Sequence, residues 1–197
     1  MMALLGRLRE RYERAFRPVG EALARLNMPP SLVTALGLAV ACMSGYAFYL
    51  GMVYEAVALM AISGLADMLD GALARALGRA SSFGELLDRV VDRYSEFAIL
   101  LGAMAGGLVS WHWGVFALFG MVMASYARST AEAVGGRGCC RGGIMERQEK
   151  LIAIALGALA TKLHPLALEV AVIAVGVLSH VTAAQRLLYA HRGLQGP

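Results

Sequence analysis

Long apolar runs alternate with short polar breaks along most of this 197-residue chain. Six of the runs have about the 20 residues that a helix needs to cross the hydrocarbon core of a bilayer. The breaks between them are rich in glycine, proline, serine or arginine, which favour turns and helix ends. The pattern predicts six transmembrane helices, over residues 31–51, 54–76, 82–106, 109–133, 146–164 and 166–188.

The first 28 residues have a different pattern. Their apolar side chains recur every three or four positions, and arginines fall largely between them. A helix of this kind lies in the headgroup plane, with its arginines on anionic lipid. We therefore expect an amphipathic juxtamembrane helix over residues 1–28, followed by a six-helix bundle over 31–188, within a single membrane domain that covers 1–197. A helix in free solvent is the alternative for the N-terminal segment.

The composition agrees with an all-α integral membrane protein. Hydrophobic residues make up 58% of the chain and charged residues only 16%, whereas soluble domains have about 25% charged residues. The net charge is +4, but the arginines are spread over several loops without interleaved aromatics, so no nucleic-acid partner is expected. The adjacent Cys139 and Cys140 have no partner at metal-ligand spacing, and we assign them no role.

Lysine and arginine concentrate in alternate connections between the expected spans. They are frequent before the first span, after the second, after the fourth and in the tail, and nearly absent from the other three connections. Cytoplasmic loops of membrane proteins show this excess. The distribution predicts a protein of the cell membrane with both termini, the 75–82 turn and the 134–147 loop in the cytoplasm.

Four aspartates interrupt the second and third apolar runs. Asp67 and Asp70 are spaced for one face of a helix, and the same holds for Asp88 and Asp92 on the next. Small residues accompany them on these faces, namely Gly71, Ala74 and Gly84. The two spans are joined by a short turn, so we expect antiparallel neighbours whose acidic faces meet near the cytoplasmic surface.

These acids are costly in a membrane unless they are neutralised. One acid at the centre of a membrane helix costs about 2.5–3.5 kcal/mol on insertion scales. Hard divalent cations such as Mg²⁺ or Mn²⁺ prefer carboxylate oxygens, so the cluster predicts a site for one or two such ions. The alternative is that Asp88 and Asp92 are only paired with nearby arginines, which are Arg75, Arg89 and Arg93.

The pattern Asp67-x2-Asp70-Gly71-x2-Ala74-Arg75-x8-Gly84-x3-Asp88-x3-Asp92 resembles the signature of the CDP-alcohol phosphotransferase family. The resemblance implies a six-helix membrane enzyme, expected as a homodimer. Such an enzyme moves a phosphate-linked group from a CDP-activated alcohol to an acceptor hydroxyl and releases CMP. Two metal ions would neutralise the diphosphate.

The resemblance also implies roles for individual residues. Asp67, Asp70 and Asp88 would be the principal metal ligands. Asp92 would be the general base and would touch the second metal. The nucleotide would be bound by residues on the first three spans, namely Thr34, Asp67, Gly71, Ala74, Arg75 and Gly84. Ser31 stands where the family usually has Asn or Asp.

A second stretch, "SYARSTAEAVGGRGCCRGGIMERQEKL", concerns the acceptor. It is similar to the region that distinguishes the family's synthases of phosphatidylinositol phosphate and of the archaeal ether-lipid counterpart. That resemblance implies a pocket for the acceptor's phosphate, formed by Ser125, Arg128, Arg147, Lys150 and Arg186. Lys150 stands where a second Arg is usual, and Thr130 replaces the family's usual Arg. Several cations beside the acids suit a phosphorylated acceptor better than a plain alcohol.

The expected reaction is therefore transfer of a phosphatidyl or archaetidyl group from CDP-diacylglycerol or CDP-archaeol to inositol 1-phosphate. The same chemistry with glycerol 3-phosphate as acceptor is one alternative. A cation-coupled transporter is the other, because acids inside a membrane often mark ion pathways. The sequence does not distinguish ester-linked from ether-linked donors.

Overall fold

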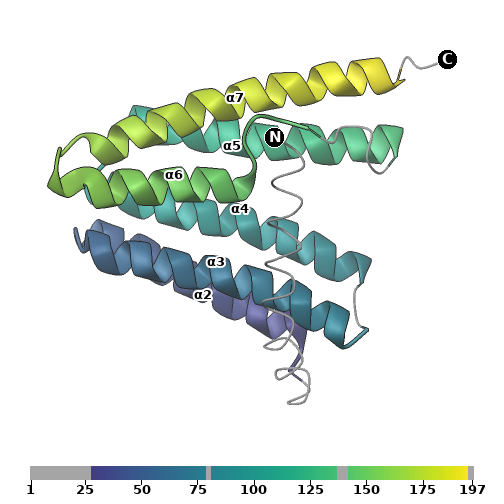
Figure 1. Cartoon of the computed structure of the whole chain (residues 1–197), viewed down its shortest axis with the longest axis horizontal. Helices are drawn as coiled ribbons and strands as arrows, with labels where there is room; N and C mark the ends of the chain where they lie inside the picture. Colours follow the sequence, from purple (N-terminus) through teal and green to yellow (C-terminus); the bar gives the residue numbers. More distant parts are fainter. Residues whose placement is uncertain (1–27, 79–80, 137–141, 195–197) are drawn as a thin grey trace.

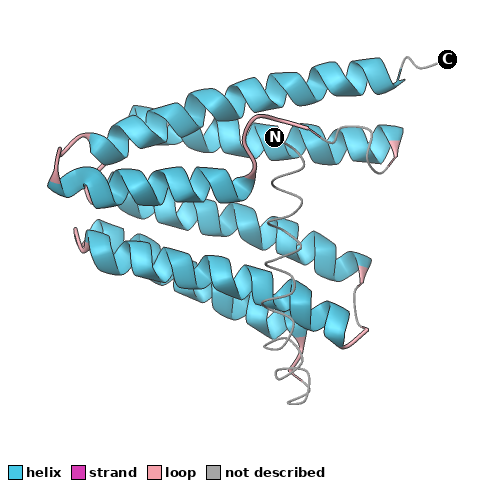
Figure 2. Cartoon of the chain, in the orientation of Figure 1, coloured by secondary structure: helices cyan, strands magenta, loops and turns pink. Residues whose placement is uncertain are grey.

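The structure is a computed structural model that describes residues 28–78, 81–136 and 142–194. It confirms the prediction of an all-α fold, and no strand occurs in the described ranges (Figure 2). The helices are α2 (Pro30–Tyr49), α3 (Val53–Ala76), α4 (Ser82–Ala105), α5 (Trp111–Gly135), α6 (Arg147–Leu159), the 3₁₀ helix η1 (Ala160–Lys162) and α7 (Ala167–Leu194). The amphipathic helix expected over 1–28, apart from its last residue, lies outside the described residues, as do Cys139 and Cys140.

The first four predicted spans begin and end within about two residues of helices α2 to α5, in the usual range for such boundaries. The fifth differs, because the expected run over 146–164 contains a 13-residue α-helix followed by the 3₁₀ turn η1. The last helix continues to Leu194, past the predicted end at 188. Its extra residues include Tyr189, His191 and Arg192, which interrupt the apolar pattern on which the prediction rests.

Three of the described helices are long and apolar enough to cross a membrane by length and composition. They are the helices Pro30–Tyr49, Val53–Ala76 and the segment Ala167–Gly193 of α7. Helix α4 has 24 residues, but its first half contains several acids and arginines. Helix α6 has only 13 residues, about 20 Å at 1.5 Å per residue.

The helices lie roughly side by side and reverse direction at each connection (Figure 1). The α2–α3, α4–α5 and α6–α7 connections lie at the left end of that view. Helix α3 ends, α4 begins, and α5 and α7 end at the right. The right-hand end therefore corresponds to the arginine-rich connections of the sequence.

Helices α3 and α4 are antiparallel, as expected, but they pack mainly against α2 rather than along each other. Helix α5 pairs with α7, and α6 contacts both α7 and α3. Thus α6 joins the α2–α3–α4 group to the α5–α7 pair. The acidic faces of α3 and α4 consequently look across a space that α2 lines on one side and the start of α6 on the other.

Glycines bring α2 and α4 into backbone contact. A Cβ atom at Gly102 would overlap the backbone of Gly45, and one at Gly45 would overlap the backbone of Ala98. A Cβ at Gly106 would meet the carbonyl oxygen of Phe48 at 2.5 Å. Small residues allow this close approach of membrane helices. The contact sets the position of α4, and hence of its aspartates, relative to α2.

We predict that Gly102→Leu lowers the free energy of unfolding by about 3 kcal/mol, the upper end of the usual range for overpacking. The reason is that the new side chain meets backbone atoms, which cannot move aside as a side chain can. Thermal unfolding in detergent would measure the effect. The matched control is Gly64→Ala in α3, where a Cβ meets nothing within 4 Å. Equal stability of the Gly102→Leu variant and the wild type would contradict the close contact.

Candidate active site

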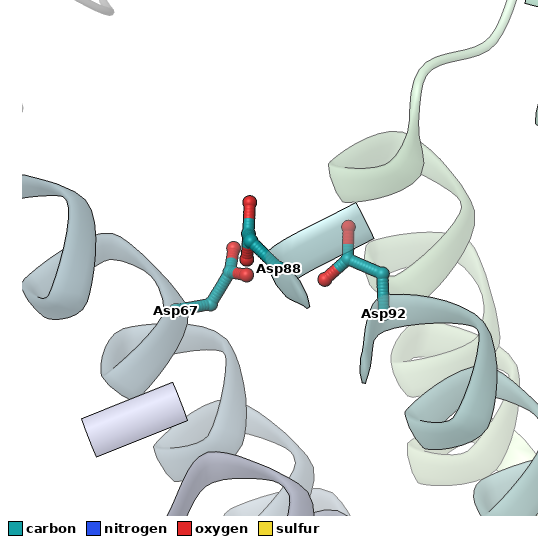
Figure 3. Close-up of side chains that lie close together, drawn as sticks. All are labelled: Asp67, Asp88 and Asp92. Carbon is teal, nitrogen blue, oxygen red and sulfur yellow. The ribbon is translucent and has the colours of Figure 1, made fainter. Parts of the chain in front are cut away.

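Three of the four aspartates come together between α3 and α4. Asp67 lies on α3, and Asp88 and Asp92 lie one turn apart on α4. One carboxylate oxygen from each lies within 4.8 Å of the others, and Figure 3 shows the three groups close together. The i,i+4 spacing on α4 produces this arrangement because it places both carboxylates on one face.

Asp70 occupies a different position, one turn after Asp67. Its side chain is 6% exposed and accepts a hydrogen bond of 2.6 Å from the hydroxyl of Thr34 on α2. Asp70 still lines a small space with Asp67, Asp92 and Thr34. Thr34, predicted near the nucleotide, therefore holds Asp70 at the wall of the aspartate cluster.

The three grouped carboxylates fit a hard divalent cation. They offer only oxygen atoms, which Mg²⁺ and Mn²⁺ prefer. Asp88 Oδ1 is buried and makes no hydrogen bond in the structure. An unpaired buried carboxylate oxygen beside two other acids is costly, and a bound cation would satisfy it.

Arg147, the first residue of α6, reaches into this cluster. Its Nη1 lies 2.7 Å from Asp67 Oδ2 and 2.8 Å from Asp92 Oδ1. The start of α6 is set by a capping box in which Glu146 and Glu149 each accept a backbone N–H of the first turn. Arg147, which the resemblance assigns to the acceptor's phosphate, thus also contacts the aspartate cluster.

A larger cavity of about 260 Å³ adjoins the cluster. All five residues predicted for the acceptor phosphate line it, together with Asp67 and Asp92. Six cationic side chains and three carboxylates contribute to its wall, which therefore has a net positive charge. The cations are Arg89, Arg93, Arg128, Arg147, Lys150 and Arg186. A cavity of this composition suits a small anion.

Two of the cavity arginines are held by neighbouring groups of the protein. Arg186 on α7 donates to the carbonyl oxygens of Ala124 at 2.7 Å and Gly142 at 3.1 Å. Arg128 on α5 donates through Nε to Glu132 at 3.0 Å. Fixed guanidinium groups lose less freedom when they bind a phosphate, so these contacts prepare the cavity for an anion.

Sequence reasoning missed several residues of this site. The sequence indicates Arg89 and Arg93 only as possible ion-pair partners of the aspartates, yet both line the cavity. Their i,i+4 spacing, one position after each aspartate of α4, was a signal for a second polar face. Glu96 is 2% exposed, and its Oε1 lies 2.9 Å from Arg93 Nη2. One further turn of the same acidic face predicts Glu96 beside the cluster.

Four of the residues expected around the nucleotide lie toward the end of α3 and the start of α4, at the right-hand end of the bundle in Figure 1. The structure does not place Gly71, Ala74, Arg75 or Gly84 in the wall of either cavity. A Cβ at Gly71 would lie 3.4 Å from Arg75 Nη1, so the glycine leaves room beside that guanidinium. The N–H of Gly84 donates to Ser81 Oγ at 3.0 Å, which caps α4.

Comparisons with known proteins identify the class of protein to which this site belongs. Residues 27–185 match the CDP-alcohol phosphatidyltransferase family. The chain belongs to this family, an integral membrane type of enzyme, and the resemblance drawn from the aspartate motif is confirmed.

Individual relatives are similar over nearly the whole chain. An archaetidylinositol phosphate synthase from Pyrococcus horikoshii is 36% identical over 192 residues, which cover 98% of this chain and 99% of that protein. The crystal structure of Mycobacterium tuberculosis phosphatidylinositol phosphate synthase with CDP-DAG bound has a TM-score of 0.80 and 31% identity, covering 90% and 94% of the two chains. The same synthase in complex with manganese and citrate has a TM-score of 0.79 and 31% identity, covering 89% and 88%.

The grouping of Asp67, Asp88 and Asp92 predicts stabilisation by metal. A cation at about 100 times its Kd should raise the unfolding free energy by about 2.7 kcal/mol. We expect Mn²⁺ to raise the melting temperature of the wild type and to have little effect on Asp88→Asn. The control is Glu55→Gln, which removes an exposed carboxylate at the opposite end of α3. A full Mn²⁺ response in Asp88→Asn would exclude that residue as a ligand.

Proposed function

We propose that this protein transfers the phosphatidyl or archaetidyl group of a CDP-activated lipid to a hydroxyl of inositol 1-phosphate and releases CMP. One observation supports this above the others: the aspartate cluster is continuous with the cationic cavity. Asp67, Asp92 and Arg147 line both spaces. An acceptor whose phosphate lies in the cavity therefore has its hydroxyl beside the acids.

The relatives support the same substrates. The archaeal relative is an archaetidylinositol phosphate synthase, and the mycobacterial structure of a phosphatidylinositol phosphate synthase contains CDP-DAG. The two differ in whether their lipids carry ether-linked or ester-linked chains, so the donor here is CDP-archaeol or CDP-diacylglycerol. The shared element of both donors is the cytidine diphosphate.

The protein uses Mg²⁺ or Mn²⁺, and the manganese complex of the mycobacterial synthase agrees with this assignment. Asp67, Asp70, Asp88 and Asp92 would hold two ions. Such ions neutralise the charge on the diphosphate and on the departing nucleotide. Thr34 lines the small space at the aspartates and keeps Asp70 in place through the 2.6 Å hydrogen bond, and it would bind the nucleotide together with Asp67.

Asp92 is the residue placed to accept the acceptor's proton. Its side chain lines both cavities and is 15% exposed. The hydroxyl oxygen of the acceptor attacks the phosphorus that bears the lipid, and its proton passes to the Asp92 carboxylate. The bond from that phosphorus to the bridging oxygen breaks, and CMP leaves with the electron pair.

The remaining roles divide between the two ends of the substrate. Gly71, Ala74, Arg75 and Gly84 would lie along the nucleotide, with Arg75 on its phosphates. The acceptor's phosphate would be bound by Ser125, Arg128, Arg147, Lys150 and Arg186. Arg89 and Arg93 line the same cavity and are paired with glutamates, Arg89 with Glu85 and Glu132 and Arg93 with Glu96.

We propose the following membrane arrangement. The helices form six spans, and the fifth is the short pair of α6 and η1. Residues 1–28 lie in the cytoplasmic headgroup layer, and the whole chain is a single domain that forms a homodimer. The basic connections and the aspartates occur toward the same end of the bundle, which supports a cytoplasmic active site with both termini on that side. Lys162, at the other end, lies 4.4 Å from the ring centroid of Tyr54.

The acceptor can be tested directly by measuring metal-dependent CMP release with CDP-diacylglycerol or CDP-archaeol. We expect turnover with inositol 1-phosphate and little with inositol, which lacks the phosphate that the cavity is charged to bind. The same assay with glycerol 3-phosphate tests the alternative acceptor. Faster release with glycerol 3-phosphate would contradict the inositol assignment, and equal rates with inositol would contradict the phosphate cavity.

For the proton acceptor, we predict that Asp92→Asn lowers the rate of CMP release by about 10²–10⁴-fold, the usual contribution of general-base catalysis. Binding of Mn²⁺ and CDP-lipid should persist in this variant, since Asp67 and Asp88 remain. Asp67→Asn is the comparison, and it should lose metal binding as well as turnover. Single-turnover CMP release by Asp92→Asn at the wild-type rate would exclude Asp92 as the base.

A further inference from the structure

The position of Arg147 poses a conflict with metal binding. Its Nη1 lies within 2.8 Å of oxygens of Asp67 and Asp92, two of the three carboxylates that fit a divalent cation. A guanidinium and a divalent cation repel each other, and both require the same acidic groups. Each carboxylate has a second oxygen, but a bound metal repels the guanidinium and therefore disfavours the contacts that Arg147 makes here.

A third acid, Glu96 on α4, lies near the Nε atom of the Arg147 guanidinium. Glu96 Oε1 is 3.8 Å from Arg147 Nε. Arg147 Nε is buried without a hydrogen-bond partner, and so is Glu96 Oε2. Because each of these buried atoms lacks a partner, a hydrogen bond between the Arg147 guanidinium and the Glu96 carboxylate becomes favourable once Arg147 moves.

We propose that Arg147 exchanges between two positions. In the metal-free protein it neutralises Asp67 and Asp92, and when a divalent cation binds there it moves to Glu96 and into the cationic cavity. In that position Nε bonds Glu96 and the Nη groups are released from the aspartates, so the cavity gains guanidinium donors for the acceptor's phosphate only after the metal site is filled. This inference rests on the proposed function, because it takes the cavity as the acceptor's binding site.

The exchange has a consequence for the order of binding. An acceptor phosphate that entered before the metal would find the Arg147 guanidinium engaged by the aspartates. With metal bound, the same phosphate can contact the Arg147 guanidinium, close to the phosphorus that the acceptor's hydroxyl attacks. Metal binding and phosphate binding are then coupled, and each raises the affinity of the other by the same factor.

Arg128 provides a matched control for this coupling. It lines the same cavity, but its ion pair is with Glu132 on its own helix, at 3.0 Å. A metal at the aspartates leaves that pair intact. Loss of Arg128 should therefore weaken phosphate binding equally with and without metal.

The test measures the affinity of purified protein for inorganic phosphate by calorimetry, without Mg²⁺ and with saturating Mg²⁺. In the wild type we expect Mg²⁺ to raise phosphate affinity about tenfold or more, within the common range of coupling between sites. Arg147→Gln should reduce this ratio to about threefold or less, the remainder arising from the charge of the ion itself. Arg128→Gln should bind phosphate more weakly but keep the wild-type ratio.

Each result has a distinct meaning. A wild-type ratio in Arg147→Gln would overturn the exchange while leaving the phosphate cavity intact. If the wild type binds no phosphate even with Mg²⁺, the acceptor cavity fails, and the proposed function and this inference fail with it.

A second measurement covers the case in which Arg147→Gln does not fold. The Glu96→Gln variant keeps Arg147 but removes the acid to which it moves. It should therefore bind Mg²⁺ more weakly, and Mg²⁺ should raise its phosphate affinity by a smaller factor. Glu96→Asp, which keeps the charge, should restore part of that ratio. A Glu96→Gln protein with the wild-type ratio would also overturn the exchange.

Discussion

The structure depends on how a group of carboxylates is neutralised between helices that pack in an apolar environment. Asp67, Asp88 and Asp92 converge, and Glu96 continues the acidic face of α4 into the interior. Water cannot screen these charges as it does at a protein surface, so cations must be supplied by the chain or by bound metal. Arg93 and Arg147 provide that charge from the protein.

Helix packing creates the space in which this balance operates. The glycine contact holds α2 against α4, and α2 also packs on α3, so α2 positions both acidic helices and their aspartate side chains converge. Helix α6 then delivers Arg147 from the opposite side, with its first turn held by Glu146 and Glu149. The same arrangement connects the acids to the cavity in which a phosphorylated acceptor fits.

Much of this could be predicted from local patterns. Apolar runs and the turn residues between them located α2 to α5, including α4 with its charged first half, and helical spacing grouped Asp88 with Asp92. The direct neighbours of α3 and α4 could not be predicted, since glycine contacts between distant segments decide them. The contacts of Arg147 could not be predicted either. A residue at the start of a helix can pair with any nearby acid, and only the fold places Asp67, Asp92 and Glu96 around it.

We infer that the carboxylates of α3 and α4 form a metal site and that Arg147 balances their charge when the metal is absent. Anomalous diffraction from crystals grown with Mn²⁺ tests it most directly. We expect a manganese peak among Asp67, Asp88 and Asp92, with the Arg147 guanidinium displaced from Asp67 and Asp92 toward Glu96. A peak elsewhere, or manganese at the aspartates with Arg147 still bonded to both, would contradict it.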